Sequence, residues 1–180
     1  MRAGGLSRRY AKALVDVAAE RGVLEPVGRD LQGMAEILKQ NREAAGLFAN
    51  PAVPLADKRR VLQSLAARAE VQSLSANFLG LLLEKRRLSH LEEIALAYEE
   101  LADERLNRGK ATVTSAAPLP EPMLEGLKVR LRRATGKEVY VEARVDPAIL
   151  GGLVAQVGST VYDGSLRTQL RRMREQLLKG

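Results

Sequence analysis

The sequence predicts an α+β fold in which an N-terminal six-helix bundle is followed by a small C-terminal α+β domain. Apolar residues recur at the three- and four-residue spacing of amphipathic helices as far as about residue 107. Beyond that point most apolar residues alternate with polar ones at the two-residue spacing of strands. We therefore place the domain boundary between residues 107 and 108, which gives domains at 1–107 and 108–180.

The ends of the first three helices are predicted from residues that begin or terminate helices. The first is expected to begin near Ser7, whose hydroxyl can cap a helix, and to end at Gly22, which tolerates a left-handed backbone. The second opens near Pro26, because proline is favoured in the first turn. A short helical turn over 44–48 then stops at Asn50-Pro51, since proline cannot continue the pattern.

The fourth helix, expected over about 57–69, carries three cations at its start. Lys58, Arg59 and Arg60 oppose the helix dipole there, so they require solvent or an acidic partner. The fifth helix, Leu74–Arg87, has leucines around nearly its whole circumference, which is typical of a helix buried on most sides.

The sixth helix separates an apolar face from an acidic one and is expected to end at Arg108-Gly109-Lys110. The second domain is then expected to combine strands with two helices. In order, we expect a strand from Val113, a helix over 122–134 capped by Gly136, a strand over 137–145, further strand over 153–162 interrupted at Gly158, and a helix over 165–178.

The composition excludes several classes of site. There is no Cys and one His, His90, so neither a disulfide framework nor a zinc cluster is expected. No apolar stretch reaches the roughly 18 residues that a membrane span needs, and the first residues lack the apolar core of a leader. We expect no span, no metal and no cofactor.

Enzyme activity is not expected either. Gly152–Thr160 has the glycines of a phosphate loop without its lysine, which favours strand kinks over phosphate binding. The acidic pairs Glu92-Glu93 and Glu99-Glu100 point about 100° apart on a helix, which favours a solvated face over acid–base catalysis. His90 has no cysteine or serine partner in view, so a capping or surface role is favoured.

The basic charge is concentrated in the second part of the chain. Of the net charge of +7, residues 106–180 contribute 13 Lys and Arg against 7 Asp and Glu. Arg171, Arg172 and Arg174 in the last helix suit an acidic protein helix or a solvated face. Nucleic acid is the alternative, but only Tyr140 and Tyr162 offer rings for stacking on bases.

Several segments together resemble one family, the delta subunit of bacterial F-type ATP synthases, which is equivalent to the mitochondrial oligomycin-sensitivity-conferring protein. The resemblance covers nearly the whole chain, and the C-terminal motifs are the most specific. The segments are Arg9-Tyr10-Ala11-Lys12-Ala13-Leu14, Asn50-Pro51 with Lys58, Asn77-Phe78-Leu79, Leu82–Leu88, Ala111–Leu119, Leu150-Gly151-Gly152-Leu153, Gly158, and Tyr162-Asp163-Gly164-Ser165-Leu166-Arg167-Thr168-Gln169-Leu170.

This resemblance implies a non-catalytic stator subunit that links the catalytic head to the peripheral stalk and so couples proton-driven rotation to ATP synthesis. It implies one copy per complex, held peripherally at the cytoplasmic face of the cell membrane. The N-terminal helix of an alpha subunit would enter a groove between the first and fifth helices, and the C-terminal region of the b subunit would meet the C-terminal domain.

The resemblance also suggests site residues. We expect the alpha-subunit groove to be lined by the exposed members of one set of apolar residues, and an acidic stretch of the b subunit to face three arginines. The first set is Tyr10, Leu14, Val17, Phe78, Leu79 and Leu82, and the second is Arg171, Arg172 and Arg174. The alternative function is a basic RNA-associated α+β protein, which would bind RNA in a strongly salt-dependent way.

Overall fold

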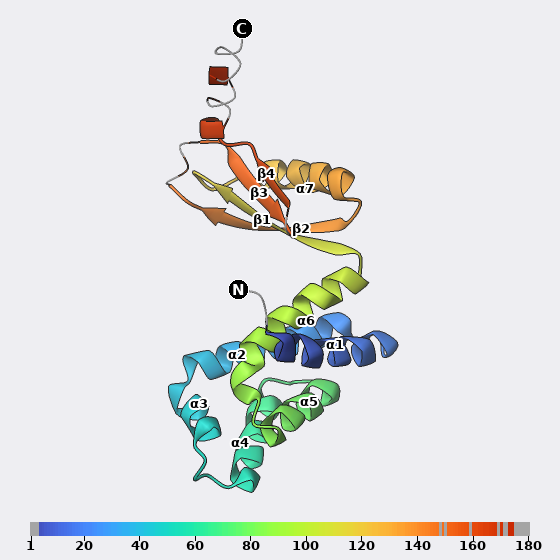
Figure 1. The fold of residues 1–180 in the computed structure, drawn as a ribbon, viewed down its shortest axis with the longest axis vertical. Coiled ribbons are helices and arrows are strands. Elements are labelled where there is room, and N and C mark those ends of the chain that lie inside the picture. Colours follow the sequence, from blue (N-terminus) through green and yellow to red (C-terminus); the bar gives the residue numbers. More distant parts are fainter. Residues whose placement is uncertain are drawn as a thin grey trace. The chain divides into compact units, whose positions relative to one another are not determined.

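The computed structural model combines a helical part with a four-stranded sheet, so the fold is α+β as predicted (Figure 1). It describes residues 4–147, 149, 151–158, 160–168, 170 and 173–174. The chain divides into two compact units, Met1–Arg105 and Leu106–Gly180, which we call the helical unit and the sheet unit.

The helical unit is a succession of amphipathic helices joined by short turns. Its first helix ends at Glu20, and Gly22, two residues later, has a φ of +67°, so the predicted left-handed glycine is confirmed. The Asn41 side chain caps the third helix by accepting a bond from the Ala44 amide at 3.0 Å. The elements are α1 (Gly5–Glu20), α2 (Leu24–Gln40), α3 (Arg42–Ala49), α4 (Leu55–Arg68), α5 (Ser73–Glu84), the 3₁₀ turn η1 (Leu88–His90) and α6 (Leu91–Arg105).

One apolar core holds these helices together. Its fully buried members come mainly from α2, α5 and α6, and they include Leu31, Leu79, Leu82 and Ile94. Tyr98 on α6 is also completely buried, and its hydroxyl donates to the Leu24 carbonyl at 3.0 Å. The largest polar side chain of this core is therefore paired, as burial of a hydroxyl requires.

Three predicted helix boundaries are wrong. The fifth helix ends at Glu84 and not at Arg87, because Arg86 has a left-handed φ of +55°. Ser7 is not the cap of α1, because the helix begins at Gly5 and Ser7 lies inside it, with its buried hydroxyl donating to Glu93 at 2.9 Å. Arg108-Gly109-Lys110 does not end α6, which stops at Arg105. Asn107 adopts a left-handed φ of +50°, and these three residues open the first strand.

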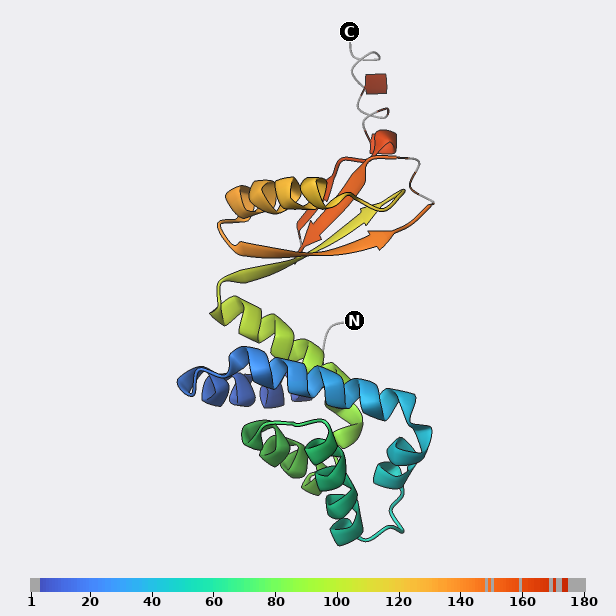
Figure 2. The ribbon, with the colours of Figure 1, turned by 180° about the vertical axis from the view of Figure 1, so that it is seen from behind.

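The sheet unit has the strand order β2-β1-β3-β4, and α7 connects the two parallel strands β1 and β2. The pairs β1–β3 and β3–β4 are antiparallel. Figures 1 and 2 show α7 lying along one face of this sheet. The elements are β1 (Arg108–Ser115), α7 (Glu121–Thr135), β2 (Glu138–Val145), β3 (Leu153–Val157) and β4 (Thr160–Asp163).

The core of the sheet unit is small. Ala111 and Val113 of β1, Ala155 of β3 and Leu131 of α7 are its buried members. The register places Val141 beside Ala111 and Val145 beside Ser115, so the predicted apolar face of β2 lies on the same side as this core. Val145 is nevertheless exposed, which means that α7 covers only part of the face.

Glycines allow the chain to turn after α7 and after β3. Gly158, with a φ of +58°, separates β3 from β4, where the sequence predicted an interruption. Gly136 ends α7 in the expected left-handed conformation.

The predicted last helix, 165–178, is described in part. Residues 166–168, 170, 173 and 174 are helical, and Ser165 precedes the helix. The other positions up to 178 lie outside the described residues.

Candidate partner-binding face on the helical unit

The candidate site is built on α1 and α5, which touch through Tyr10 and Phe78. Their ring centroids are 6.5 Å apart and the ring planes are inclined by 68°, an edge-to-face contact. The two helices singled out in the sequence therefore meet in the folded chain. The contact also fixes which side of each helix borders the other.

Most of the predicted groove residues belong to the core. Leu79 and Leu82 are completely buried, and Leu14 and Phe78 are nearly so. All four are members of the apolar core of the helical unit. A side chain that already packs on every side has no surface left for a partner. These four are therefore not among the exposed members that the sequence was expected to supply, because the centre of an amphipathic stripe is what a bundle buries first.

Tyr10 and Val17 remain available. Val17 is 36% exposed, whereas Tyr10 is half-buried against the core. Sequence reasoning missed Leu81, which is 41% exposed and lies one turn from Phe78 on α5. Its exposure could not be read from the sequence, because the leucines of this helix surround its axis.

Helical spacing places these exposed residues in line with the aromatic contact. On α1 the apolar residues beside Tyr10 recur at intervals of three and four, and on α5 those beside Phe78 do the same. We call this set the α1–α5 face: Leu6, Tyr10, Ala13, Val17, Leu74, Phe78 and Leu81.

The face can bind apolar surface, but it offers no catalytic chemistry. Its side chains are aliphatic or aromatic, and the Tyr10 hydroxyl is its one polar side-chain group. In the part of the chain that the structure describes, no group of three or more His, Cys, Asp or Glu side chains could hold a metal ion. Contacts with a partner at this face would depend on apolar burial.

The three cations at the start of α4 find partners within the chain. Arg59 pairs with Glu84 on α5, and Arg60 pairs with Asp57 one turn earlier. The Lys58 ammonium donates to the Phe48 carbonyl at 2.9 Å. The prediction that these side chains need solvent or an acid is confirmed for both arginines, and Lys58 caps α3 instead.

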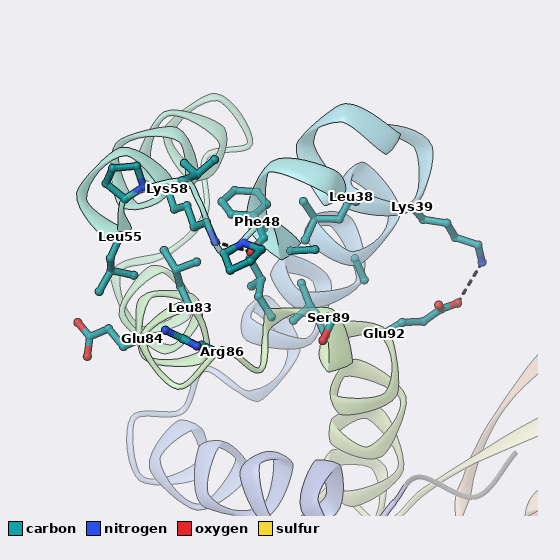
Figure 3. Close-up of a pocket in the computed structure, with 18 residues that line it drawn as sticks. Leu38, Lys39, Phe48, Leu55, Lys58, Leu83, Glu84, Arg86, Ser89 and Glu92 are labelled. Carbon is teal, nitrogen blue, oxygen red and sulfur yellow. Dashed lines mark hydrogen bonds and ion pairs between the residues drawn. The ribbon is translucent and has the colours of Figure 1, made fainter.

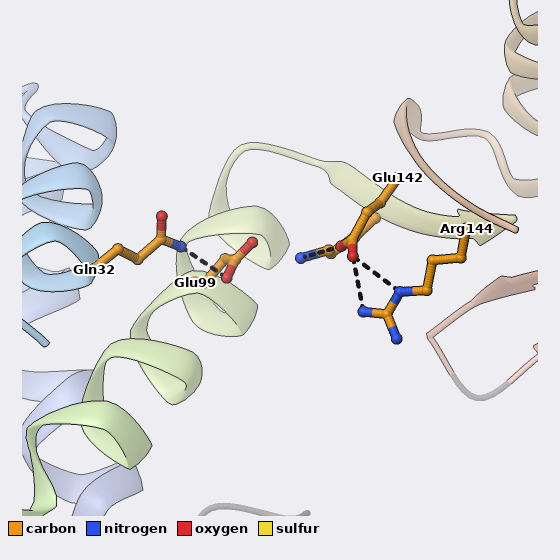
Figure 4. Close-up of polar contacts among 5 residues, drawn as sticks. Gln32, Glu99, Glu142 and Arg144 are labelled. Carbon is orange, nitrogen blue, oxygen red and sulfur yellow. Dashed lines mark hydrogen bonds and ion pairs between the residues drawn. The ribbon is translucent and has the colours of Figure 1, made fainter. Parts of the chain in front are cut away.

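Exposed polar contacts also link α2 to α6. Gln32 donates to Glu99 at 2.9 Å (Figure 4), and Lys39 pairs with Glu92 at 3.0 Å. The hydrogen bond and the charge of Glu92 raise the pKa of Lys39. Glu92 and Glu99 therefore link α6 to α2 through side chains on the outer side of the helices.

The face of the sheet opposite α7 is polar and internally paired. The Glu142 carboxylate accepts two hydrogen bonds from the Arg144 guanidinium, at 2.7 and 3.1 Å (Figure 4). It also forms an ion pair with the Lys110 ammonium at 3.0 Å. The hydrogen bonds from Arg144 and then from Lys110 lower the pKa of Glu142. Glu142 offsets one of the two cations beside it, so this cluster keeps one positive charge.

The described part of the last helix presents an apolar stripe to solvent. Leu166, Leu170 and Met173 follow the spacing i, i+4, i+7 and are all exposed, Leu170 to 63%. Arg167 and Arg174 are also exposed. Arg171 and Arg172, the other two predicted stalk residues, lie outside the described residues. An exposed apolar stripe with flanking cations suits a helix that carries acidic residues.

No helix among the described residues is both long and apolar enough to span a lipid bilayer.

Comparison with known proteins covers both units. Residues 6–177 match the family model described as "ATP synthase delta (OSCP) subunit". The chain is 43% identical over 174 residues to "ATP synthase subunit delta" of Myxococcus xanthus, covering 96% of each chain. It is 44% identical to the protein of that name from Anaeromyxobacter sp. (strain Fw109-5), covering 97% of each. Among solved structures, a chain of the mitochondrial ATP synthase hexamer of Toxoplasma gondii aligns with a TM-score of 0.71 and 28% identity, over 97% of this chain and 98% of that one.

Proposed function

Because this chain belongs to the ATP synthase delta (OSCP) subunit family, we propose that it is a non-catalytic stator subunit that joins the catalytic head to the peripheral stalk. The observation that carries this proposal is the match over residues 6–177, which includes the helical unit and the sheet unit together. A subunit that links two partners needs two binding regions, and relatives of nearly the same length match the helical unit and the sheet unit together.

The helical unit supplies the attachment to the head. We take α1 to α6 to be the six-helix bundle expected for residues 1–107, and the α1–α5 face to receive the N-terminal helix of an alpha subunit. The exposure of Val17 and Leu81 beside the Tyr10–Phe78 contact supports this assignment. An amphipathic helix laid on such a face buries its own apolar stripe, at about 25 cal/mol for each Å² removed from water.

The sheet unit, expected for residues 108–180, supplies the attachment to the stalk. The stripe Leu166, Leu170 and Met173 would pack on the C-terminal region of the b subunit, and Arg174 would face its acidic side chains. Exposed ion pairs contribute little affinity but guide association, so we expect the apolar stripe to hold this contact and the arginines to orient it.

The role requires no bond to be made or broken in this subunit. A rotary motor produces ATP only when its stationary part resists torque, and one copy of a linker gripping both ends provides that resistance. Hydrogen-ion transport then belongs to the complex, and this subunit sits peripherally at the cytoplasmic face of the cell membrane.

A tagged full-length chain recovered from lysate of its source cells tests this proposal. We expect the alpha and b subunits to be recovered with it, before and after nuclease treatment. Recovery of RNA that is lost steeply as salt rises, without ATP synthase subunits, would support the basic RNA-associated alternative instead. No feature of the described residues or of the comparisons favours that alternative.

A further inference from the structure

A second candidate site is a cavity of about 820 Å³ that opens on the helical unit. It lies where the ends of α2, α3 and α5 meet the starts of α4 and α6 (Figure 3). No residue of the α1–α5 face lines it. The apolar part of its wall is formed by Leu38, Phe48, Val53, Leu55, Leu83 and Leu88.

The apolar wall is accessible to a partner. Leu55, at the first turn of α4, is 45% exposed, and Phe48 on α3 is half-buried. Leu83 on α5 is buried and forms the floor between them. A volume of this size is within the roughly 300–1,000 Å³ of binding pockets that bury most of a bound group.

On the rim of the cavity, the cationic side chains without an acidic partner outnumber the acidic side chains without a cationic one. Its two acids are already paired, Glu84 with Arg59 and Glu92 with Lys39. Among the described residues, no carboxylate pairs with Lys58 or Arg86, and Lys58 donates only to a carbonyl. Figure 3 shows Lys58 and Arg86 on either side of Leu83, with Glu84 next to Arg86.

The backbone at Arg86 adds a second observation. Arg86 follows α5 in the left-handed region, with a φ of +55°, where its amide bonds to the Leu83 carbonyl at 3.0 Å. Glycine adopts this conformation without strain, whereas a side chain there costs free energy. Glu70 after α4 and Asn107 after α6 adopt the same conformation, so it is a recurrent helix ending in this chain. At Arg86 it places an exposed cation at the rim of the cavity.

We propose that this cavity docks an acidic amphipathic helix of a protein partner. Apolar side chains of that helix enter between Phe48, Leu55 and Leu83, and its carboxylates meet Lys58 and Arg86. A helix fits better than a small anion, because the two cations come from different helix ends and are separated by an apolar side chain. Several carboxylates along one helix face reach both, whereas one carboxylate group reaches only one.

The test uses the full-length chain labelled with ¹⁵N and two synthetic helical peptides. Both peptides carry Leu at positions i, i+3, i+4 and i+7; one has Glu on the flanks and the other has Lys. We expect the Glu peptide alone to bind saturably, with amide shifts at residues such as Phe48, Leu55 and Arg86. Changes confined to the α1–α5 face, or equal binding of the two peptides, would overturn the proposal, as would absence of binding at millimolar peptide.

A matched pair of variants distinguishes the contribution of the Arg86 cation to binding from any effect on stability. Arg86→Gly removes the cation and relieves the strained backbone, so we expect unchanged or higher thermal stability with at least five-fold weaker binding of the Glu peptide. Glu70→Gly relieves the same kind of strain at the end of α4, where φ is +51°, and is expected to leave affinity unchanged. Charge reversal by Lys58→Glu with Arg86→Glu should transfer binding to the Lys peptide. Undiminished affinity in Arg86→Gly contradicts the role assigned to this arginine.

Discussion

The carboxylate of Asp30 on α2 accepts a hydrogen bond of 2.6 Å from the hydroxyl of Ser75 on α5. The same oxygen accepts from the Gln72 amide at 3.0 Å, at the residue that precedes α5. Ser75 is completely buried. One side chain of α2 thus provides the capping acceptor that the start of α5 lacks within its own sequence, and it joins the two helices.

Asp30→Ala should therefore lower the free energy of unfolding by about 1–3 kcal/mol, because it leaves the buried Ser75 hydroxyl and a helix-terminal amide without this acceptor. Urea unfolding followed by circular dichroism measures the loss. Glu36→Ala, an exposed acid on the same helix, is the control and should change stability by less than about 0.5 kcal/mol. Equal effects of the two substitutions would mean that the Asp30 contact contributes nothing.

Burial of the Tyr98 hydroxyl makes the stability of the helical unit depend on pH in the alkaline range. Burial raises the pKa of Tyr98 well above its ordinary value of about 10. The folded state therefore holds the phenolic proton at pH values where the unfolded chain releases it. The sign of the linkage follows: the contribution to stability is full below about pH 10 and is lost as pH rises further.

Tyr98→Phe should remove this dependence and the bond to the Leu24 carbonyl, which costs about 0.5–1.5 kcal/mol near neutral pH. Above about pH 10 the difference between the two proteins should shrink and then reverse, since lysine titration is common to both. Urea midpoints measured from pH 7 to 11 provide the check. Parallel pH profiles would contradict the assigned role of Tyr98.

Gly152 is the least replaceable glycine of the sheet unit. Its φ is +80°, and a Cβ atom there would lie 2.4 Å from the Gly164 carbonyl oxygen and 3.0 Å from the Ser165 Cα. Backbone cannot move aside as a flexible side chain does, so Gly152→Ala should cost about 3 kcal/mol, from left-handed strain together with overpacking.

Gly136→Ala is the matched control, because its φ of +69° is similar but its Cβ would meet nothing within 4 Å. It should cost only about 1 kcal/mol. Amide hydrogen exchange of the β1 and β3 strands reports the stability of this unit directly. If both variants lose the same stability, steric contact with Gly164 is not what constrains Gly152.

Partner binding on the α1–α5 face can be tested at residues that the core does not need. Val17→Asp and Leu81→Asp should each weaken binding of an alpha-subunit N-terminal peptide at least ten-fold, about 1.4 kcal/mol, and leave the fold intact. Leu14→Asp or Leu79→Asp would unfold the helical unit and so report nothing about the partner. Leu96→Asp, at an exposed leucine of α6, is the control and should bind normally. Normal affinity in Val17→Asp and Leu81→Asp would mean that the α1–α5 face does not bind the alpha-subunit peptide.

The sequence was sufficient for the order and type of most elements, because the signals are local. Left-handed glycines at 22, 136 and 158, and Asn50-Pro51, act within a few residues of the boundaries that they mark. The strand β1 was predicted five residues too late, since Arg108 to Thr112 is stabilised by pairing with Glu138 to Glu142, which is far along the chain.

The candidate site was harder to predict than the fold. The spacing of Phe78, Leu79, Leu81 and Leu82 identifies an apolar helix, but not which of these side chains faces outward. That choice depends on where α2 and α4 pack against α5, which is tertiary information. The contribution of Asp30 to α5 was likewise hidden, because it crosses from one helix to another.

The most direct test of the central claim is whether the full-length chain binds both partners at once. We would titrate the ¹⁵N-labelled protein with an alpha-subunit N-terminal peptide and then with a C-terminal fragment of the b subunit. The account predicts an equimolar ternary complex, with amide shifts first in α1 and α5 and then in the sheet unit around Leu166 and Leu170. Competition between the two partners, or binding of neither, would contradict a subunit that links the head to the stalk.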